Sequence, residues 1–357
     1  LYERILSERI YHLVESKGIL SPYQAGYRKL RGCEDQIAST IQAIEDGFER
    51  PKMERSVLVL LDFSKAFDTV WREKLLVSLH QMGLPLQIIR WLREFLRNRT
   101  ARVRFNGILS QVVSFHQGVP QGSVLSPLLF ILYINDLANK LPKGLIYSMY
   151  ADDIAILATH HSIESAEAAA QRAVDIVVEW AAEWRLTLNT SKSEVSLFSS
   201  FTHDAKKRPH IVINNEPLKF QPYPRLLGVT LDRQLTFNKH VQEVVISATS
   251  KIRLLSCISN SKWGWRKNQV TQIYLSHVKS IMDFAGFAWQ PYISIDNMRR
   301  LETVQNKALK IATGVYRNSP QEARRAEVGL ESYATQSKRA IMIAREKAIR
   351  LPDDHPR

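Results

Sequence analysis

Two adjacent carboxylates near the middle of the chain are the residues best placed to do chemistry. They end the sequence Tyr-Ala-Asp-Asp at residues 150–153, between the apolar runs 145–149 and 154–158. Short apolar runs predict buried strands, so we expect Asp152 and Asp153 at the tip of a tight hairpin. Neighbouring carboxylates repel one another unless a cation lies between them, and Mg²⁺ prefers carboxylate and phosphate oxygens. The alternative is a solvated Asp-Asp turn, which is common in hairpins.

A third carboxylate, Asp62, follows the strongly apolar run at residues 56–61. An apolar run that ends in an aspartate predicts a central strand with a carboxylate at its end. Three carboxylates that converge at the ends of two strands predict a pair of bound metal ions. Such a pair clamps the attacking and leaving oxygens of a phosphoryl transfer. The alternative for Asp62 is that it caps the helix that follows.

The rest of the pattern predicts a mixed body followed by an all-helical part. Expected strands cover residues 56–62, 186–188, 194–199 and 226–231, and expected helices cover 1–19, 34–49, 71–82, 86–97, 124–139 and 163–184. Alternating residues at 101–116 predict a hairpin that turns at Asn106-Gly107. Later helices are expected at 238–258, 266–288, 294–313 and 332–350. This change places a domain boundary near residue 232.

The net charge of +14 is concentrated in the last third of the 357-residue chain. Residues 233–357 hold 21 Lys and Arg against 10 Asp and Glu, a net of +11, which leaves +3 for residues 1–232. This skew indicates contact with a polyanion such as a phosphate backbone, although basic helices are often only solvated. Cations interleave with aromatic residues at Trp263, Trp265, Arg266 and Lys267, as in nucleic-acid grooves, although such tryptophans also occur in helical cores.

The two cysteines, Cys33 and Cys257, allow neither a disulfide framework nor a cysteine-rich zinc site, which fits a reducing intracellular compartment. The N-terminus predicts a charged amphipathic helix rather than a signal peptide. The longest apolar run, residues 124–134, is too short to span a bilayer. Because the first residue is Leu1, we expect a piece of a longer product.

Three further segments complete an ordered set of motifs with the Asp62 strand and the Tyr-Ala-Asp-Asp hairpin. They are Gln117–Phe130 with its Pro-Gln-Gly turn, Leu186–Glu194 and Leu226–Asp232. Together these segments resemble the polymerase motifs of reverse transcriptases, specifically those of non-LTR (LINE-type) retrotransposons, over nearly the whole chain. The resemblance implies an α+β right-hand polymerase with a split βαβ palm. It assigns residues 1–55 to partial fingers, 56–232 to the palm with inserted fingers helices, and 233–357 to a basic helical thumb and C-terminal extension.

The resemblance also implies roles for the residues around the metal ions. Asp62 and Asp152 are expected to bind metal directly, Asp153 more peripherally, and the carbonyl of Phe63 as an additional ligand. Lys192 is expected to protonate the pyrophosphate leaving group, with a solvated lysine as the alternative. The next two roles concern the incoming nucleotide.

Phe67 is expected to lie under the incoming sugar, where it collides with a 2′-hydroxyl, and Gln121 to pack against the nucleotide. Their alternatives are a core phenylalanine and a simple turn. Contacts with the nucleic acid are expected from the catalytic hairpin, from the primer-grip strand and from a basic fingers segment. The hairpin residues are Tyr150 and Ala151, the primer-grip residues are Leu227 and Gly228, and the fingers residues are Arg28, Lys29 and Arg31. Arg28 and Arg31 are assigned to the nucleotide and Lys29 to the template, with a flexible basic loop as the alternative.

The implied activity is RNA-directed DNA polymerisation, by two-metal nucleotidyl transfer that extends a DNA 3′ end on an RNA template. The implied cofactors are two Mg²⁺ ions, with Mn²⁺ as a substitute, and the implied partners are an RNA template, a DNA primer or nicked target DNA, and dNTPs. The expected location is the nucleus and cytoplasm, as a ribonucleoprotein. A catalytically weak or inactive RNA-binding remnant is the alternative, because a fingers segment of relatives that carries a triphosphate-binding arginine would precede Leu1. An RNA-templated RNA polymerase is disfavoured by Phe67.

Overall fold

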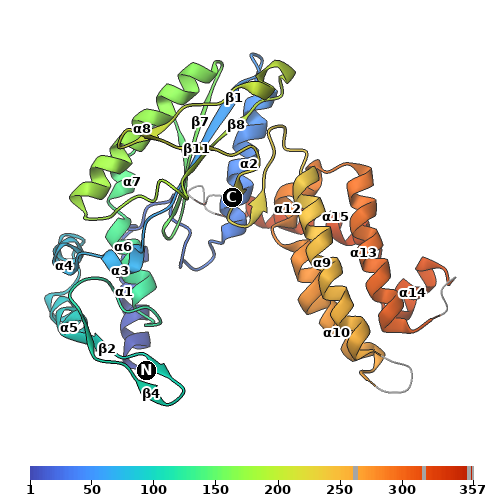
Figure 1. Ribbon diagram of the computed structural model, residues 1–357, viewed down its shortest axis with the longest axis horizontal. Helices are drawn as coiled ribbons and strands as arrows, with labels where there is room; N and C mark the ends of the chain where they lie inside the picture. The colour runs from blue at the N-terminus through green and yellow to red at the C-terminus, as the bar shows by residue number, and fades with distance from the viewer. Residues whose placement is uncertain (260–263, 316–318, 352–354, 356–357) are drawn as a thin grey trace.

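A five-stranded mixed sheet carries the sequence motifs (Figure 1). The computed structural model describes residues 1–259, 264–315, 319–351 and 355. The strand order is β11-β8-β1-β7-β6, and all neighbours are antiparallel except β11 and β8. The bounds are β1 (Arg55–Leu61), β6 (Ile146–Tyr150), β7 (Asp153–His160), β8 (Glu194–Phe198) and β11 (Lys219–Phe220). The α+β fold class predicted from the sequence is confirmed.

Helices cover both faces of this sheet, with α8 on one side and α2 on the other (Figure 1). The helices up to the sheet's last strand are α1 (Tyr2–Ser16), α2 (Cys33–Glu49), α3 (Ala66–Thr69), α4 (Arg72–Gln81), α5 (Leu86–Leu96), α6 (Ser126–Ile134), α7 (Leu137–Lys140), α8 (Ile163–Glu183) and the 3₁₀ helix η1 (Thr202–Lys206). The later ones are α9 (Asn238–Ile258), α10 (Lys267–Ile273), the π-helix η2 (Tyr274–Lys279), α11 (Ser280–Asp283), α12 (Gly286–Trp289), the 3₁₀ helix η3 (Gln290–Tyr292), α13 (Ile295–Thr313), α14 (Gln321–Val328) and α15 (Tyr333–Ile349).

Four two-stranded ribbons lie outside the main sheet. They pair β2 (Arg99–Ala101) with β5 (Val113–Phe115), β3 (Arg104–Phe105) with β4 (Ile108–Leu109), β9 (Val212–Ile213) with β10 (Glu216–Pro217), and β12 (Arg225–Leu226) with β13 (Val229–Thr230). The β3–β4 ribbon turns at Asn106 and Gly107, which both have positive φ, as the Asn-Gly sequence predicts.

The alternation of side chains along β1 and β7 divides the interior into two cores. Val57 and Val59 of β1 face a core built with α1, α6 and α8, whereas Leu58 between them faces a second core. On β7, Ile156 faces the first core and Leu157 the second. Because successive residues of a strand point to opposite faces, one sheet serves as the wall of both cores.

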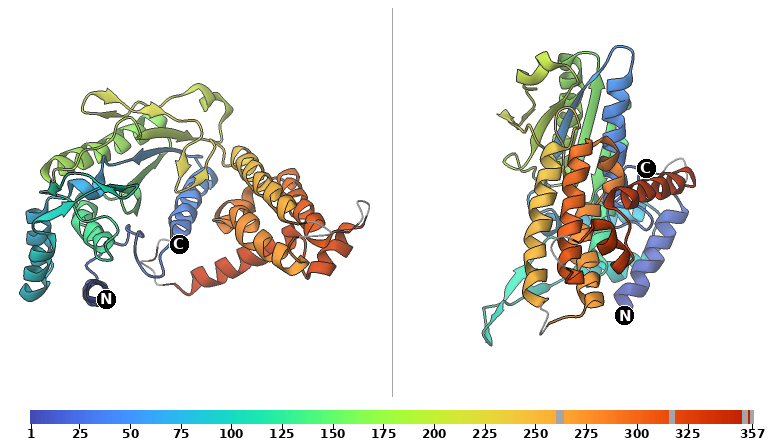
Figure 2. Two further views of the ribbon diagram at one scale, coloured as in Figure 1. Left: turned by 60° about the horizontal axis from the view of Figure 1, so that its bottom comes forward. Right: turned by 90° about the vertical axis from the view of Figure 1, so that its right-hand side faces the viewer.

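The second core joins α2 to the helices beyond residue 237. Ile37 and Ile41 of α2 are buried together with Val241 of α9 and Trp289 of α12. Helix α15 crosses from the helical part back toward α2, as both views in Figure 2 show. The core therefore does not divide at residue 232, where the change in pattern and charge predicts a domain boundary.

Several expected elements are shorter or broken in the structure. The expected helix 266–288 divides into α10, η2, α11 and α12, and Ala285 before α12 has a φ of +49°. One tertiary and one local hydrogen bond hold this break, because the Ala285 amide donates to Oε1 of Glu34 at 3.1 Å and the Trp289 indole to the Phe284 carbonyl at 3.0 Å. The expected strand 226–231 is the β12–β13 ribbon, the helix expected over 124–139 divides into α6 and α7, and α14 was not predicted.

Buried positions of the broken segment recur every four residues, at Val270, Tyr274, Val278 and Met282. An α-helix has 3.6 residues per turn, so a four-residue repeat would drift around its surface. The wider turns of the π-helix η2 fit this longer repeat.

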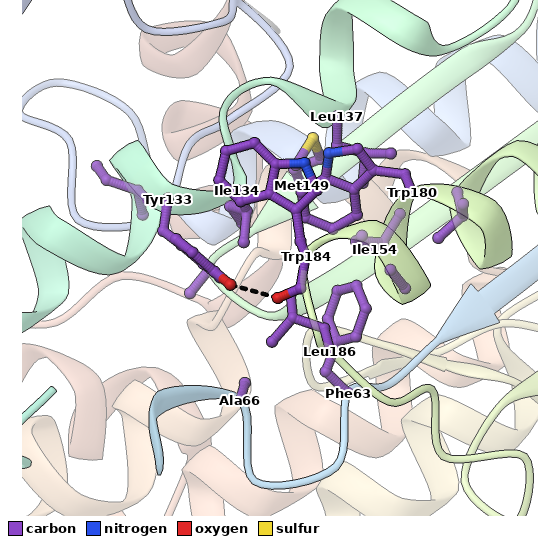
Figure 3. Packing of buried hydrophobic residues seen from close by; sticks show 14 of the residues in the cluster. Phe63, Ala66, Tyr133, Ile134, Leu137, Met149, Ile154, Trp180, Trp184 and Leu186 are labelled. Carbon is purple, nitrogen blue, oxygen red and sulfur yellow. Dashed lines mark hydrogen bonds between the residues drawn. The ribbon is translucent and has the colours of Figure 1, made fainter. Parts of the chain in front are cut away.

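A hydrogen bond between helices fixes the first core behind the catalytic hairpin (Figure 3). The buried hydroxyl of Tyr133 donates to the main-chain carbonyl of Trp184, and the Trp71 amide donates to the same hydroxyl at 3.3 Å. The Trp184 ring stacks on Trp180 with centroids 5.5 Å apart. This cluster backs Met149 of β6, the strand that leads into the catalytic turn (Figure 3).

Replacing Tyr133 with Phe is therefore expected to lower the free energy of unfolding by about 1–3 kcal/mol, because the buried Trp184 carbonyl loses its partner. Urea unfolding of the whole chain measures this change. Tyr223→Phe is the matched control, since its side chain is 49 % exposed. Equal midpoints for the two variants would contradict the assignment.

Candidate active site

The catalytic hairpin is a two-residue turn between β6 and β7. Tyr150 pairs with Asp153, which leaves Ala151 and Asp152 as the central residues. Ala151 has a φ of +56°, in the left-handed region that a turn of this type usually fills with glycine. The aspartates therefore lie at the tip of a tight hairpin, as predicted, and the turn carries backbone strain that its surroundings must hold.

A fingers segment, residues 23–26, holds this strained turn. It runs parallel to the end of β6: the Met149 amide donates to the Tyr23 carbonyl at 3.0 Å, and the Ala25 amide to the Met149 carbonyl at 2.9 Å. The buried side-chain oxygen of Gln24 accepts from the Ala151 amide at 3.0 Å. Gly26 packs so closely that a Cβ there would lie 2.4 Å from the Ala151 nitrogen. The position of Asp152 thus depends on a segment more than a hundred residues upstream.

Arg28 supports this segment and is not available to a nucleotide. Its side chain is 5 % exposed and forms a bidentate pair with Glu15 of α1, at 2.8 and 2.7 Å. The same guanidinium donates to the carbonyls of Ser21 and Gln24. The expected contact between Arg28 and the nucleotide therefore has no basis in the geometry, because the residue ties α1 to the loop that clamps the catalytic turn.

The other two fingers cations lie on the surface of the same loop. Lys29 pairs with Glu8 at 2.7 Å, and its side chain is 63 % exposed. Arg31 donates to the Pro22 carbonyl at 2.8 Å. Lys29 thus contacts α1, and Arg31 contacts its own loop. Their nucleic-acid roles stay predictions.

Asp62 lies beside the catalytic hairpin. Leu61 is opposite Ile154, so the next step of the register sets Asp62 opposite Asp153, on the same face of the sheet. Asp62 and Asp153 both line a cavity of about 280 Å³, together with Tyr150, Lys192 and Leu227. The cavity thus brings together five residues that belong to four separate sequence motifs. Asp152 does not line it.

The chain that follows α8 fixes the backbone of Asp62 from the side. The Asn189 amide donates to the Asp62 carbonyl at 2.8 Å, and the Asp62 amide to the Ser193 hydroxyl at 3.2 Å. Lys192 lies in this turn, with its Nζ 3.7 Å from Oδ2 of Asp62. That distance permits an ion pair but is too long for a hydrogen bond, so the buried Oδ2 keeps an unused lone pair.

The surroundings of the two hairpin aspartates disfavour their charged forms. Partial desolvation raises the pKa of Asp152, and the charge of Asp62 raises it further. Desolvation also raises the pKa of Asp153, with added repulsion from Asp152 and Asp62, while Lys192 opposes both shifts. Raised carboxyl pKa values in a cavity are typical of sites that bind a cation or a proton.

The donor set fits a hard divalent cation. Buried, unpartnered Oδ2 of Asp62 and two repelling aspartates supply the oxygen ligands that Mg²⁺ prefers. Within the part of the chain that the structure describes, however, no three Asp, Glu, His or Cys side chains converge on a single point. The metal role of the aspartates therefore rests on their chemistry and placement, and it is argued below as a proposal.

Phe67 does not line the cavity that Asp62, Asp153 and Leu227 share. It is half-buried, stacks on Phe130 with centroids 4.4 Å apart, and meets the Tyr27 ring edge-on at 6.4 Å. The pKa of Tyr27 is raised by burial and then by the charge of Asp152. The charge of Asp152 thus acts on Tyr27, whereas Asp153 lines the cavity, and Tyr27 is a site residue that the sequence patterns did not predict.

The Pro-Gln-Gly turn packs against the segment that carries Phe67. Nε2 of Gln121 donates to Oδ1 of Asp68 at 2.9 Å, and the Val119 amide to the Phe67 carbonyl at 2.8 Å. Arg72, whose residue surface is 9 % exposed, donates to three carbonyls of the strand that leads into this turn. Its acceptors are Phe115, Gln117 and Gly118, at 2.8–2.9 Å.

The primer-grip motif is a ribbon turn rather than the strand that the sequence predicts. Leu227 and Gly228 are its two central residues and both have positive φ, at +44° and +99°. A Cβ on Gly228 would lie 3.2 Å from the Phe284 ring, which accounts for the glycine. Glu194 and Arg225 also line the cavity beside Leu227 and were missed, although Glu194 begins a strand next to Asp62 as a recognisable strand-end carboxylate.

The structure describes three of the four residues singled out in the expected thumb. Trp263 lies outside the described residues. Trp265 is 49 % exposed, and Lys267 pairs with Glu327 at 2.6 Å. No helix among the described residues is long and apolar enough to cross a bilayer, and Cys33 and Cys257 are free thiols.

Because the folded chain raises the pKa of Asp153 above its ordinary value of 3.8, its ionisation opposes folding. Because protonated Asp153 is uncharged, this opposition is absent below that ordinary value. The folded chain then loses stability as the pH rises through the raised pKa of Asp153. Asp153→Asn should therefore raise the Tm at pH 7, and this gain should shrink as the pH falls toward about 4. Calorimetry without divalent metal measures it, with Asp175→Asn on the exposed face of α8 as the control. A destabilised Asp153→Asn at pH 7 would contradict the repulsion.

Comparison with known proteins identifies the family of this chain. The family model for "Reverse transcriptase (RNA-dependent DNA polymerase)" matches residues 1–257. The probable RNA-directed DNA polymerase from transposon X-element of Drosophila melanogaster is 29% identical over 88% of this chain, and the polymerase from mobile element jockey of Drosophila funebris is 31% identical over 88%. The chain spans 34% of the length of each of these relatives. Among solved structures, apo telomerase from Candida tropicalis has a TM-score of 0.45 at 11% identity, over 87% of this chain and 53% of that one. The chain belongs to the reverse transcriptase (RNA-dependent DNA polymerase) family, in the non-LTR retrotransposon group that its motifs predict.

Proposed function

We propose that this chain is the polymerase part of a non-LTR retrotransposon protein and extends a DNA 3′ end along an RNA template. The observation that carries the proposal is the arrangement of Asp62, Asp152 and Asp153 at one sheet edge. On one side of them lie Phe67 and Gln121, and on the other lies the turn at Leu227. A nucleotide and a primer terminus can approach the same carboxylates from these two sides.

The three aspartates are proposed to hold two Mg²⁺ ions, or Mn²⁺ in their place, with Asp62 shared between the two sides. When bound, such ions activate the primer hydroxyl and neutralise the charge of the triphosphate. Asp62 supplies an unused buried oxygen, and Asp152 lies on the nucleotide side through its proximity to Tyr27. The Phe63 carbonyl is kept as an additional ligand only on the family resemblance.

Lys192 is proposed to hold a proton near the leaving group. Its ammonium lies 3.7 Å from Asp62 and its side chain is 68 % exposed, so it can turn from the carboxylate to a pyrophosphate oxygen. A charge-assisted contact of this kind is stronger than a neutral hydrogen bond. The family resemblance supplies the proton donation itself.

Phe67 is proposed to select deoxyribose. Its ring is fixed by stacking on Phe130, while the Tyr27 edge and the Gln121–Asp68 bond border it. A ring held in this way cannot move aside for a 2′-hydroxyl without losing its stacking contact. Gln121 is proposed to pack against the same nucleotide.

The primer and template are proposed to lie on the opposite side and along the helical part. Tyr150 and Leu227 line the cavity, and Ala151 and Gly228 follow them in the two turns. Residues 233–357, with their net charge of +11, are proposed to contact the phosphate backbone of the duplex. An intracellular ribonucleoprotein location and a nicked target DNA follow from the same proposal.

Asp62→Asn should abolish primer extension on poly(rA)/oligo(dT) with dTTP and Mg²⁺, with a loss of the order of a hundredfold or more. The amide keeps the shape of the side chain but not the charge that holds a cation. Asp175→Asn should retain the parent rate, and circular dichroism should show that both variants are folded. If Asp62→Asn extends within a few-fold of the parent, the aspartates are not catalytic. A parent chain that binds the hybrid without extending it would point to the RNA-binding remnant.

Phe67→Val should lower the ratio of kcat/KM for dTTP over that for UTP about tenfold or more, mainly because UTP is used better. Removing the ring opens space under the sugar. Phe67→Tyr is the control, since it keeps the ring and should keep the ratio. An unchanged ratio in the valine variant would mean that Phe67 acts only in packing against Phe130.

A further inference from the structure

Two adjoining cavities lie along α4 and the β2–β5 ribbon, and the first of them also reaches the Pro-Gln-Gly turn. The first, of about 400 Å³, is lined by Asp68, Gln121 and Arg99, among others. The second, of about 600 Å³, lies between α4, α5 and the β2–β5 ribbon and is lined by Arg93, Arg97 and Arg99. The two share Arg99, Thr100, Phe115 and the buried Arg72. Arg99 is therefore the residue at which a ligand beside Gln121 would pass into the second cavity.

The charge of the second cavity is strongly positive. Arg93, Arg97 and Arg99 are exposed and have one acidic neighbour in the lining, Glu73. Arg97 approaches Glu94 at only 3.8 Å, where both side chains are about two-thirds exposed, so that pair is weak. Among the described residues no carboxylate pairs with Arg93 or Arg99 in the ion pairs that the structure contains. These guanidinium groups are available to an anion.

Aromatic faces lie between these cations. The Arg99 guanidinium lies over the Phe95 ring, 5.1 Å from its centroid, and Phe115 in the shared wall is 47 % exposed. Phe95 is already stacked on Trp91, with ring centroids 5.1 Å apart, so Phe115 supplies the open face. Proteins hold unpaired nucleotides with such pairs of features, since bases stack on rings while phosphates meet the cations.

The wall that carries Arg99 is also fixed to the nucleotide side. Arg72 donates to the carbonyls of Phe115, Gln117 and Gly118, so β5 and the Pro-Gln-Gly turn are held as one unit. A ligand seated on this wall therefore has a defined position relative to Gln121. This is what a template needs, because its next base must arrive in register with the nucleotide.

We propose that the cavities between α4, α5 and the β2–β5 ribbon bind the unpaired 5′ stretch of the template RNA before it is copied. The proposal rests on the proposed function. The strand enters past Arg93 and Arg97, reaches Arg99 and delivers its next base beside Gln121. Figure 1 shows the β2–β5 ribbon and α5 on the side of the sheet opposite the helices α9–α14. The unpaired template and the duplex would thus contact different parts of the chain.

The test compares two RNA–DNA hybrids with the same duplex, one with a single unpaired template nucleotide and one with about six. Their Kd values are measured by fluorescence anisotropy over a range of KCl concentrations, without dNTP. The full chain should bind the longer overhang more tightly and with a steeper salt slope. Arg97→Gln/Arg99→Gln should flatten that slope by about 1.4, which corresponds to two phosphate contacts with a single strand. Binding of the short-overhang hybrid should change less than about twofold.

Arg102→Gln/Arg104→Gln is the matched control, because both arginines are exposed on the same ribbon segment and line neither cavity. It should leave both hybrids unaffected. Equal losses on both hybrids, equal losses in the control, or no effect of overhang length would each overturn the proposal. Single-nucleotide extension of the short-overhang hybrid is measured in parallel. If extension fails in the parent chain, the proposed function fails, whereas normal extension without overhang dependence overturns only this inference.

Discussion

Three negative charges at one edge of a sheet are the constraint to which the rest of the structure responds. Carboxylates at the end of β1 and in the β6–β7 turn repel one another, and the pKa values of Asp152 and Asp153 are raised by desolvation and, in addition, by this repulsion. Holding them together requires that the backbone beneath each be fixed from elsewhere. Residues 187–193 fix Asp62, and the loop at residues 23–26 fixes the Ala151 turn. The charged carboxylates therefore lower the stability of the folded chain at the position where the proposed function needs them.

This constraint explains why the supporting contacts come from distant parts of the sequence. Glu15 of α1 holds Arg28, which holds the carbonyl of Gln24, whose side chain in turn accepts from the Ala151 amide. β6 is the last strand of the sheet, so its open side takes the loop at residues 23–26 as a partner. The same holds near Gln121, where Arg72 of α4 donates to three carbonyls of a distant segment. In both places an arginine that is almost fully buried stabilises a loop.

The sequence predicts those features that depend on local pattern and on motif order. The aspartate hairpin, the Asn106-Gly107 turn and the long helices α8, α9 and α13 follow from periodicity and turn chemistry. The role of Arg28 could not be predicted, because only tertiary contact distinguishes a buried guanidinium from a free one. The break at Ala285 depends on Glu34, some 250 residues away. Leu227 shows a third limit. A leucine at positive φ is rare, so the identity of this residue did not predict a turn there.

The π-helix η2 has a consequence for how this part of the chain can change in evolution. A π-helix differs from an α-helix by about one added residue per turn, and it keeps Tyr274 and Val278 in line with Met282. Loss of one residue from the π-helix could be taken up by a return to ordinary α-helical winding, whereas gain or loss of a residue in an α-helical turn rotates everything beyond it by about 100°. Such a rotation would move Phe284 away from Gly228 and Ala285 away from Glu34. A change of length between the helical part and the primer-grip ribbon is therefore compatible with these contacts only where the π-helix absorbs it.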